Sequence, residues 1–524
     1  MSMFFSSIFL ICIPISLVLA GWLVGRKPTQ SQGRRLIFLN LLLVGLFAAG
    51  VLAHWLLPSP PPTQQYLSTA NLSLIMLALV LFMGTILMTF SRNYMASESR
   101  LNMYWRWLLH TLATVSLVVM SNHLILFWLG WVCISLALHK LLTFYPERPR
   151  AALAAHKKFL LARTAELCLL VAFICLYQAH NTFFIHELVD TFNLQASNTA
   201  LSLSTNEHIA AALIAIVALI KCAQLPVHGW LIQVVEAPTP VSALLHAGVI
   251  NLGGFLLILF GPLLLQVATA QWLVLIVAGL TTVISALIMT TRISLKVRLA
   301  WSTSAQMGLM LLECALGLFE LALLHLLTHS VYKAHAFLNS GNAIHEDLQR
   351  RLAPAEAPSA GDWLIAATLS ACLVGGAAYV IHYQGVWSAW VLFGLALIVL
   401  IAQRHSQQRK ASLMSAIGLT LILLTIYSTM KAFFGLILPI NPMLRVPALS
   451  LADFWVMGLF ISLFILSWLL RYQAQRPSVQ HLSMALFAGL YLDEWLTRLT
   501  LKVWPLRLPT RVNSKTLTQQ TSIK

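Results

Sequence analysis

The chain has 524 residues, of which 59% are hydrophobic and only 9% are charged. Apolar runs of 18 or more residues recur along its whole length. This pattern predicts an all-α polytopic membrane protein and excludes both a soluble enzyme and a β-barrel. The net charge of +17 lies in short loops between apolar runs, which is typical of membrane topology signals and argues against nucleic-acid binding. The seven cysteines form no CxxC pair, so neither a disulfide framework nor a zinc ribbon is expected.

We expect about 15 membrane-spanning segments, with boundaries uncertain by a few residues. The division between the fourth and fifth segments depends on the short turn at 121–123. The segments lie near residues 4–25, 36–57, 70–90, 107–121, 123–142, 158–178, 207–234, 241–266, 271–290, 298–317, 319–340, 362–382, 386–402, 411–437 and 452–471.

The loops between these segments alternate in charge. The loops at 58–69 and 179–207 contain neither lysine nor arginine. The positive-inside rule therefore predicts a multi-pass protein of a bacterial inner membrane with its N-terminus outside and its C-terminus in the cytoplasm. An amphipathic piece at 482–508 is expected to lie on the membrane surface. The basic loops carry Arg26, Lys27, Arg34 and Arg35; Arg92, Arg100 and Arg106; Lys140, Arg148, Arg150, Lys157 and Lys158; Arg292, Lys296 and Arg298; Arg350 and Arg351; and Arg404, Arg409 and Lys410.

The segment 219–256 concentrates two unfavourable features at membrane depth. Its sequence, LIKCAQLPVHGWLIQVVEAPTPVSALLHAGVINLGGFL, places Lys221 in an apolar run and His246 on the next one. A charge at that depth costs about 2.5–3.5 kcal/mol on insertion scales and usually faces a polar pathway. A broken helix is tolerated there only where protein or enclosed water satisfies its backbone. We expect three prolines to break this helix and the segment to be the functional centre (Pro226, Pro238 and Pro240).

Other ionisable residues lie in apolar segments and could extend Lys221 into a proton relay. Burial and neighbouring charges can bring lysine, histidine and glutamate to protonation equilibria near neutrality. A Glu166–Lys221 pair would keep the lysine charged, and separating the pair would let it release a proton. The predicted ion pathway consists of Glu166, Lys221, His246, His325, His329 and Lys333, with Arg163, His228 and Lys431 in support.

Structural interpretations of the same residues stay open. Lys221 could belong to a purely structural buried ion pair, and the His325, His329 and Lys333 stripe could hydrogen-bond helices together. Lys431 could extend to the membrane surface, while Glu313 and Glu320 would suit an interface. A zinc site at His325 and His329 is disfavoured because neither an HExxH glutamate nor a third ligand is present. We therefore expect no metal in this chain.

Four motifs resemble one family of membrane proteins. The segments 221–248, 297–308, 325–341 and 489–499 resemble motifs of the antiporter-like subunits of respiratory complex I and Mrp antiporters, the last motif being typical of the subunit-5 branch. The resemblance implies two inverted five-helix repeats, a discontinuous seventh helix and charged residues at mid-membrane. It suggests N-terminal helices at 1–106, repeats at 107–266 and 267–402, C-terminal helices at 403–471 and a cytoplasmic amphipathic tail at 472–524.

Departures from the family pattern narrow the resemblance. Leu129 stands where the family's glutamate is expected. No lysine or acid occurs between 363 and 402 to serve as the family's second broken-helix lysine, and only His382 is available there. The long lateral helix of the complex I subunit is also missing. The chain resembles most closely the membrane subunits of two-component inorganic-carbon accumulation systems. That resemblance implies a transporter subunit rather than an enzyme, conducting protons or sodium ions. Its implied partner is a cytoplasmic zinc subunit similar to β-carbonic anhydrases. The alternatives are a complex I-like or Mrp-like cation/proton antiporter and a non-conducting membrane anchor.

Overall fold

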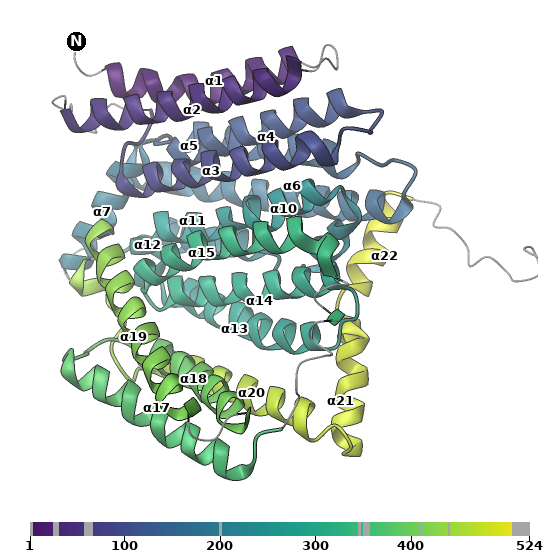
Figure 1. Ribbon diagram of the computed structural model, residues 1–524. Helices are drawn as coiled ribbons and strands as arrows, with labels where there is room; N and C mark the ends of the chain where they lie inside the picture. The colour runs from purple at the N-terminus through teal and green to yellow at the C-terminus, as the bar shows by residue number, and fades with distance from the viewer. Residues whose placement is uncertain are drawn as a thin grey trace, which may run out of the picture.

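The computed structural model describes residues 4–24, 31–56, 66–198, 202–343, 347–348, 357–407, 411–438 and 441–505. Within these ranges the fold is all-α, as predicted (Figure 1). The helices are α1 (Phe4–Val24), α2 (Ser31–Leu56), α3 (Asn71–Tyr94), α4 (Leu101–Met120), α5 (Leu124–Leu142), α6 (Pro149–His180), α7 (Ile185–Ser197), α8 (Thr205–Lys221), α9 (Gly229–Gln233), α10 (Thr239–Ala247), α11 (Leu252–Leu259), α12 (Gly261–Gln266), α13 (Ala268–Thr290), α14 (Leu295–Ala315), α15 (Phe319–Leu338), α17 (Ala360–Val380), α18 (Ser388–Gln407), α19 (Ala411–Ile437), α20 (Leu451–Tyr472), α21 (Pro477–Phe487) and α22 (Glu494–Val503).

Each expected membrane segment coincides with one of these helices or with a broken pair. Among the described residues, 10 helices are long and apolar enough to cross a membrane. The remaining expected segments correspond to α4, α8, α14, α15 and α18, which are shorter or more polar. The turn between α4 and α5 is confirmed, and isolated bridges from Ser121 to Leu67 and from His123 to Phe184 hold it. Sequence patterns missed α7, which lies in a predicted polar loop.

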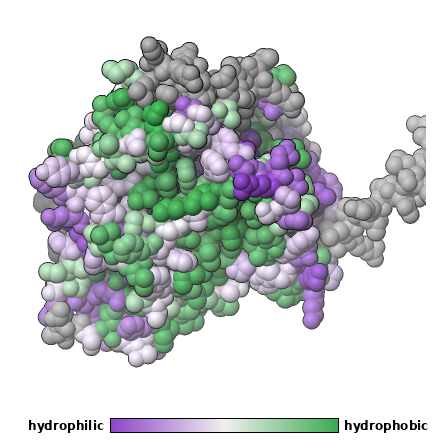
Figure 2. Space-filling view, turned by 90° about the horizontal axis from the view of Figure 1, so that it is seen from below, coloured by the Kyte–Doolittle hydropathy of each residue, from purple (hydrophilic) through white to green (hydrophobic). Residues whose placement is uncertain are grey.

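The long helices run side by side in layers, from α1 and α2 at one edge to α17–α20 at the other (Figure 1). Helix ends that carry basic residues are tied to one another. The Arg100 guanidinium donates to the Phe144 carbonyl at 3.5 Å, and Arg148 donates to the Glu236 carbonyl at 3.4 Å. We call the end of the bundle where Arg100 and Arg148 lie the basic end. Figure 2 shows a wide apolar area across the middle of one face with hydrophilic residues toward both helix ends, as a membrane-embedded bundle requires.

The C-terminal tail contains two short helices. In the described part of 482–508, a turn at 488–493 separates α21 from α22. These two helices cross the ends of the bundle (Figure 1), and we call them the strap. The strap is anchored on α6, where Lys157 Nζ donates to Asp493 Oδ2 at 2.6 Å and Trp504 stacks on His156 with ring centroids 3.8 Å apart. Residues 506–508 lie outside the described residues.

Candidate functional site

The helix break predicted around Pro226 is present. Helix α8 ends at Lys221, Ala223 adopts a left-handed conformation with φ 51°, and the Gln224 amide donates to the Leu219 carbonyl at 3.0 Å. This pattern closes a helix C-terminus. The other two prolines do not break α8. Pro238 is the residue that precedes α10, and Pro240 lies in its first turn, where the missing amide hydrogen costs nothing.

Side chains from neighbouring helices satisfy the backbone freed by this break. The Leu225 amide donates to Thr281 Oγ1 of α13 at 3.0 Å. The Ser304 hydroxyl of α14 donates to the Ala223 carbonyl at 2.9 Å. The non-helical backbone is thus buried in protein, the condition that makes it tolerable at membrane depth. Lys221 consequently lies at a helix C-terminus, where the partial negative charge of the carbonyls favours a cation.

The structure brings Glu166 and Lys221 together. Lys221 Nζ lies 3.6 Å from Glu166 Oε1, and the Arg163 guanidinium contacts Glu166 Oε2 at 2.7 Å. Ser135 of α5 joins them, because its hydroxyl donates to Glu166 Oε1 and accepts from Lys221 Nζ at 3.3 Å. The Glu166 side chain is only 4% exposed. Three helices therefore build one buried, charge-assisted hydrogen-bond cluster, the Glu166 cluster.

Lys158 is the residue of this region that sequence patterns misassigned. The sequence places Lys157 and Lys158 in a basic loop, but α6 begins at Pro149 and contains both. Lys158 is buried, with 7% exposure, and its Nζ donates to the Ser135 carbonyl at 2.9 Å. The loop prediction is wrong because charged residues in the first turns of a long helix look like a loop in a hydropathy pattern.

Leu129 does not occupy the position of a missing partner for Lys221. It is 48% exposed on the outer surface of α5. The α5 residues that face the lysine are Ser135 and Trp131, whose ring centroid is 5.3 Å from Lys221 Nζ. A carboxylate at 129 would therefore point away from the cluster.

His246 and Lys333 converge on adjacent residues of α14. The fully buried His246 has its Nδ1 at 3.2 Å from Thr303 Oγ1, and its ring stacks on Phe337 with centroids 4.4 Å apart. Lys333 Nζ donates to Ser302 Oγ at 2.7 Å and to the Leu299 carbonyl at 3.1 Å. Among the described residues, these partners hold Lys333 without a counter-ion.

Lys333 belongs to a polar stripe on α15 whose other two residues are His325 and His329. His325 lies between two acceptors, with Nδ1 at 3.0 Å from Glu313 Oε2 and Nε2 at 3.0 Å from Gln306 Oε1. The His329 ring is 6.0 Å from that of His325, centroid to centroid, and neither of its nitrogens has a hydrogen-bond partner among the described residues. Glu313 thus contacts the stripe directly.

Two cavities flank this stripe. A cavity of about 360 Å³ between α14, α15, α18, α19 and α20 is lined by Gln306, Glu313 and His325. A second cavity of about 600 Å³ at the basic end is lined by Ser302 and His335, among others. Because Ser302 binds Lys333, the stripe extends from the wall of one cavity to the wall of the other.

A chain of neutral polar groups lies between Lys221 and His246. Within the described ranges, no hydrogen bond or ion pair joins these two side chains directly. The buried Gln224 donates through Nε2 to the Cys222 carbonyl at 2.7 Å and to the Ser304 carbonyl at 3.4 Å. Ser304 is the neighbour of Thr303, which contacts His246. An uncharged amide gives no signal in a search for ionisable residues, so the sequence did not single out Gln224.

Other predicted residues lie apart from these contacts. His228 is buried beside Trp301, with ring centroids 4.9 Å apart, and lines a cavity of about 250 Å³ beneath the strap with Arg292. Burial lowers the pKa of Arg292 from its ordinary value. Lys431 of α19 donates to the Tyr383 hydroxyl at 3.4 Å. His382 is exposed in the turn after α17, so it cannot replace a buried lysine.

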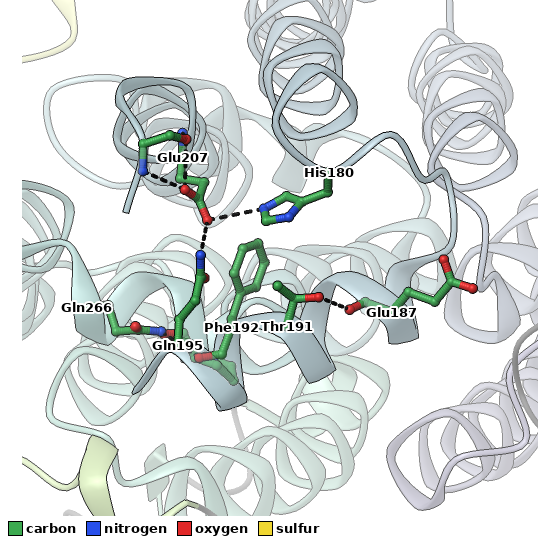
Figure 3. Close-up of polar contacts among 9 residues, drawn as sticks. His180, Glu187, Thr191, Phe192, Gln195, Glu207 and Gln266 are labelled. Atoms are coloured by element: carbon green, nitrogen blue, oxygen red, sulfur yellow. Dashed lines mark hydrogen bonds and ion pairs between the residues drawn. The ribbon is translucent and has the colours of Figure 1, made fainter. Parts of the chain in front are cut away.

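A further buried acid, Glu207, begins α8 (Figure 3). It accepts from His180 Nε2 at 3.1 Å and from Gln195 Nε2 at 3.0 Å, and it forms a capping box with Ser204. Glu207 and Lys221 are at opposite ends of α8, about 21 Å apart at the α-helical rise. The residues of α8 between them are apolar apart from His208. We therefore assign Glu207 to fixing the start of α8.

The comparisons with known proteins agree with this architecture. Residues 121–374 match the family described as NADH:quinone oxidoreductase/Mrp antiporter. The chain is 45% identical over 509 residues to the probable inorganic carbon transporter subunit DabB of Hydrogenovibrio crunogenus, covering 97% of this chain and 96% of that protein. It is 36% identical to the probable subunit DabB2 of Halothiobacillus neapolitanus, covering 83% and 80% of the two chains. A chain of the Mrp complex from Dietzia sp. has the same fold, with a TM-score of 0.63 and 20% identity, over 98% of this chain and 61% of that chain.

Proposed function

Because the chain belongs to the DabB family of inorganic carbon transporter subunits, within the wider NADH:quinone oxidoreductase/Mrp antiporter family, we propose that it conducts protons across the membrane to energise carbon uptake. One observation carries this proposal. Buried titratable side chains on α15 lie between two cavities in a bundle whose remaining interior is largely apolar. Intramembrane ionisable residues of this kind typically form proton relays.

The proposed route follows the stripe on α15. A proton enters from the cavity of about 360 Å³, where Glu313 and Gln306 orient His325. It then passes by way of His329 to Lys333. It leaves through the cavity of about 600 Å³ at the basic end, which we assign to the cytoplasm by the positive-inside rule. Protons suit this route better than sodium ions, because two histidines and a lysine offer nitrogen sites rather than a cage of oxygen ligands.

We assign the Glu166–Lys221 pair the role of controlling this route. Gln224 and the adjacent Ser304 and Thr303 link the break after α8 to His246. Lys333 is bound to Ser302, the next residue along α14. A change in the separation of Lys221 from Glu166 would alter the charge near this chain of contacts and hence the stability of a proton on Lys333. Arg163 contacts the same carboxylate, so Glu166 would keep a cationic partner when Lys221 moves away.

The proposed use of the proton flux is hydration of CO₂ to bicarbonate by a cytoplasmic zinc subunit similar to β-carbonic anhydrases. The relatives are named as subunits, and the arginines and lysines of the basic end offer a face for a soluble partner. One proton crossing 100 mV releases about 2.3 kcal/mol. This energy shifts a coupled equilibrium by more than about tenfold.

The family match and the Mrp-like fold support a second candidate, a cation/proton antiporter. It would exchange sodium for protons and would not require a carbon-hydrating partner. Sodium-dependent proton movement by the purified chain, without a zinc-containing partner, would favour it over carbon accumulation. A third candidate, a membrane anchor without conduction, predicts no ion movement at all.

The experiment is replacement of Lys221 by alanine in cells that depend on this system for inorganic carbon. We expect carbon accumulation to be lost while an affinity-tagged chain still co-purifies with its zinc subunit. The variant removes only the lysine that controls proton movement and leaves the assembly of the complex unchanged. His382→Ala, at an exposed residue in the turn after α17 that takes no part in the proposed route or docking face, is the control and should accumulate carbon normally. Accumulation by Lys221→Ala at the wild-type rate would exclude the proposed role of this lysine.

A further inference from the structure

The Glu166 cluster contains more positive than negative charge. Arg163 and Lys221 both contact the single carboxylate of Glu166. Lys158 is a third basic side chain, itself buried, attached to the same cluster through Ser135. With all of these side chains ionised, the cluster would hold a net charge of +2 in an apolar bundle. Unpaired buried charge is among the most destabilising features of a folded protein.

The hydrogen bonds indicate which lysine can be neutral. Lys221 lies in an ion pair with Glu166, an interaction that requires the ammonium form. The hydrogen bond recorded for Lys158 Nζ runs to the Ser135 carbonyl, and a neutral amine donates to a carbonyl as an ammonium does. In the described part of the chain, no carboxylate forms an ion pair with Lys158. Lys158 is therefore the cluster's best candidate for an uncharged lysine.

Ser135 accepts a hydrogen bond from each of the two lysines, one through its hydroxyl and one through its carbonyl. Its hydroxyl accepts from Lys221 Nζ at 3.3 Å, and its carbonyl accepts from Lys158 Nζ at 2.9 Å. Along α6, the backbone of Lys158 is eight residues before that of Glu166, about 12 Å closer to the basic end. Its neighbour Lys157 is already at the strap, paired with Asp493. Lys158 thus lies between the Glu166–Lys221 pair and the cytoplasmic tail.

We propose that Lys158 is a second proton-carrying lysine of the Glu166 cluster, accepting the proton that Lys221 releases and thereby moving the charge that controls the route along α15. This inference rests on the proposed proton conduction. In the transfer the ammonium of Lys221 becomes an amine and the amine of Lys158 becomes an ammonium, so the charge of the cluster is unchanged. The step moves positive charge toward the strap without creating an additional buried ion.

The test uses the complete complex in proteoliposomes, with proton uptake driven by an inside-negative potential and followed by an internal pH dye. Lys158→Met removes the amine, and Lys158→Arg keeps the charge but holds its proton permanently. We expect both variants to lower proton uptake at least tenfold. Lys158→Met should also unfold at a temperature equal to or above that of the wild type, because it replaces a buried amine that has no carboxylate partner among the described residues with an apolar side chain. Lys158→Gln, which retains a donor for the Ser135 carbonyl, replaces Lys158→Met in the uptake measurement if the latter does not assemble.

The outcomes separate this inference from the proposed function. If the wild-type complex moves no protons, proton conduction itself is wrong. If the wild type conducts and Lys221→Ala does not, but Lys158→Met or Lys158→Gln conducts within twofold of the wild type, only the role of Lys158 is wrong. Normal conduction by Lys158→Arg would show that Lys158 supplies a fixed structural charge. Lys140→Met, at an exposed lysine, controls for the loss of a positive charge as such.

Discussion

The Glu166 cluster and the polar stripe on α15 hold their lysines in different ways. Lys221 has a carboxylate partner, whereas Lys333 is fully buried against the Ser302 hydroxyl and the Leu299 carbonyl. The first arrangement requires ionised side chains to be stable, while the second tolerates a neutral lysine. The difference suggests that the cluster stores charge and that the stripe transmits protons.

The largest expected effect is the loss of the carboxylate in the cluster. Glu166→Ala leaves the largely buried Lys221 and the partly exposed Arg163 without their counter-ion. Because solvent screens Arg163, the loss of stability should be at most about 3–5 kcal/mol, the loss typical of a broken buried ion pair. Thermal unfolding of the detergent-solubilised complex measures this loss, and proton uptake should disappear with it. Glu166→Asp, which keeps the charge on a shorter side chain, is the matched control and should recover part of the stability. If Glu166→Ala unfolded at the wild-type temperature, the carboxylate of Glu166 would not be what balances the positive charges of the cluster.

Loss of the lysine in the stripe should affect conduction and leave folding intact. Lys333→Met removes a buried amine that has no carboxylate partner among the described residues, so the unfolding temperature should be unchanged or higher. Proton uptake should fall by at least about tenfold, since a positioned proton carrier is lost. Conduction at the wild-type rate would place the route elsewhere in the bundle. A large loss of stability would instead indicate that Lys333 is a structural element.

The smallest expected effect comes from the hydroxyl that orients Lys333. Ser302→Ala removes one hydrogen bond from Lys333 Nζ and leaves the bond to the Leu299 carbonyl. The stability cost should be about 0.5–1.5 kcal/mol, and proton uptake should fall several-fold without being lost. Ser304→Ala, at a serine that binds the break rather than the lysine, is the comparison variant. A stronger effect on proton uptake from Ser304→Ala than from Ser302→Ala would favour control from the break after α8 over exit beside Lys333.

The sequence predicted the parts of this molecule that carry a strong physical signal. Long apolar runs predicted the helices, and Lys221 beside Pro226 predicted the broken helix. Prolines alone did not separate a break within α8 from the start of α10, because Pro238 and Pro240 suit a first helical turn equally well. The helix α7 was missed because it lies in a segment too polar and too short to span a membrane.

For the candidate site, the sequence identified charged residues and missed the neutral groups that join them. Ser135 and Gln224 have ordinary polar side chains, and only the fold shows that each connects two helices. Lys158 was counted with the basic loop residues because it was the first residue of the expected segment, which began nine residues after the true start of α6. For Glu313 the sequence suggested an interface position, and the fold adds a contact with His325. Such contacts depend on distances in space, which residue order does not contain.

The division into two inverted repeats stays a prediction, as does the role of each pathway residue. The central claim is that protons cross this chain under the control of Lys221. Its most direct test is voltage-driven proton uptake into proteoliposomes that contain the complete complex, compared between the wild type and Lys221→Ala at equal reconstitution. We predict rapid internal acidification with the wild type and a rate equal to protein-free vesicles with Lys221→Ala. Equal acidification by the two proteins, or none with the wild type, would contradict this account.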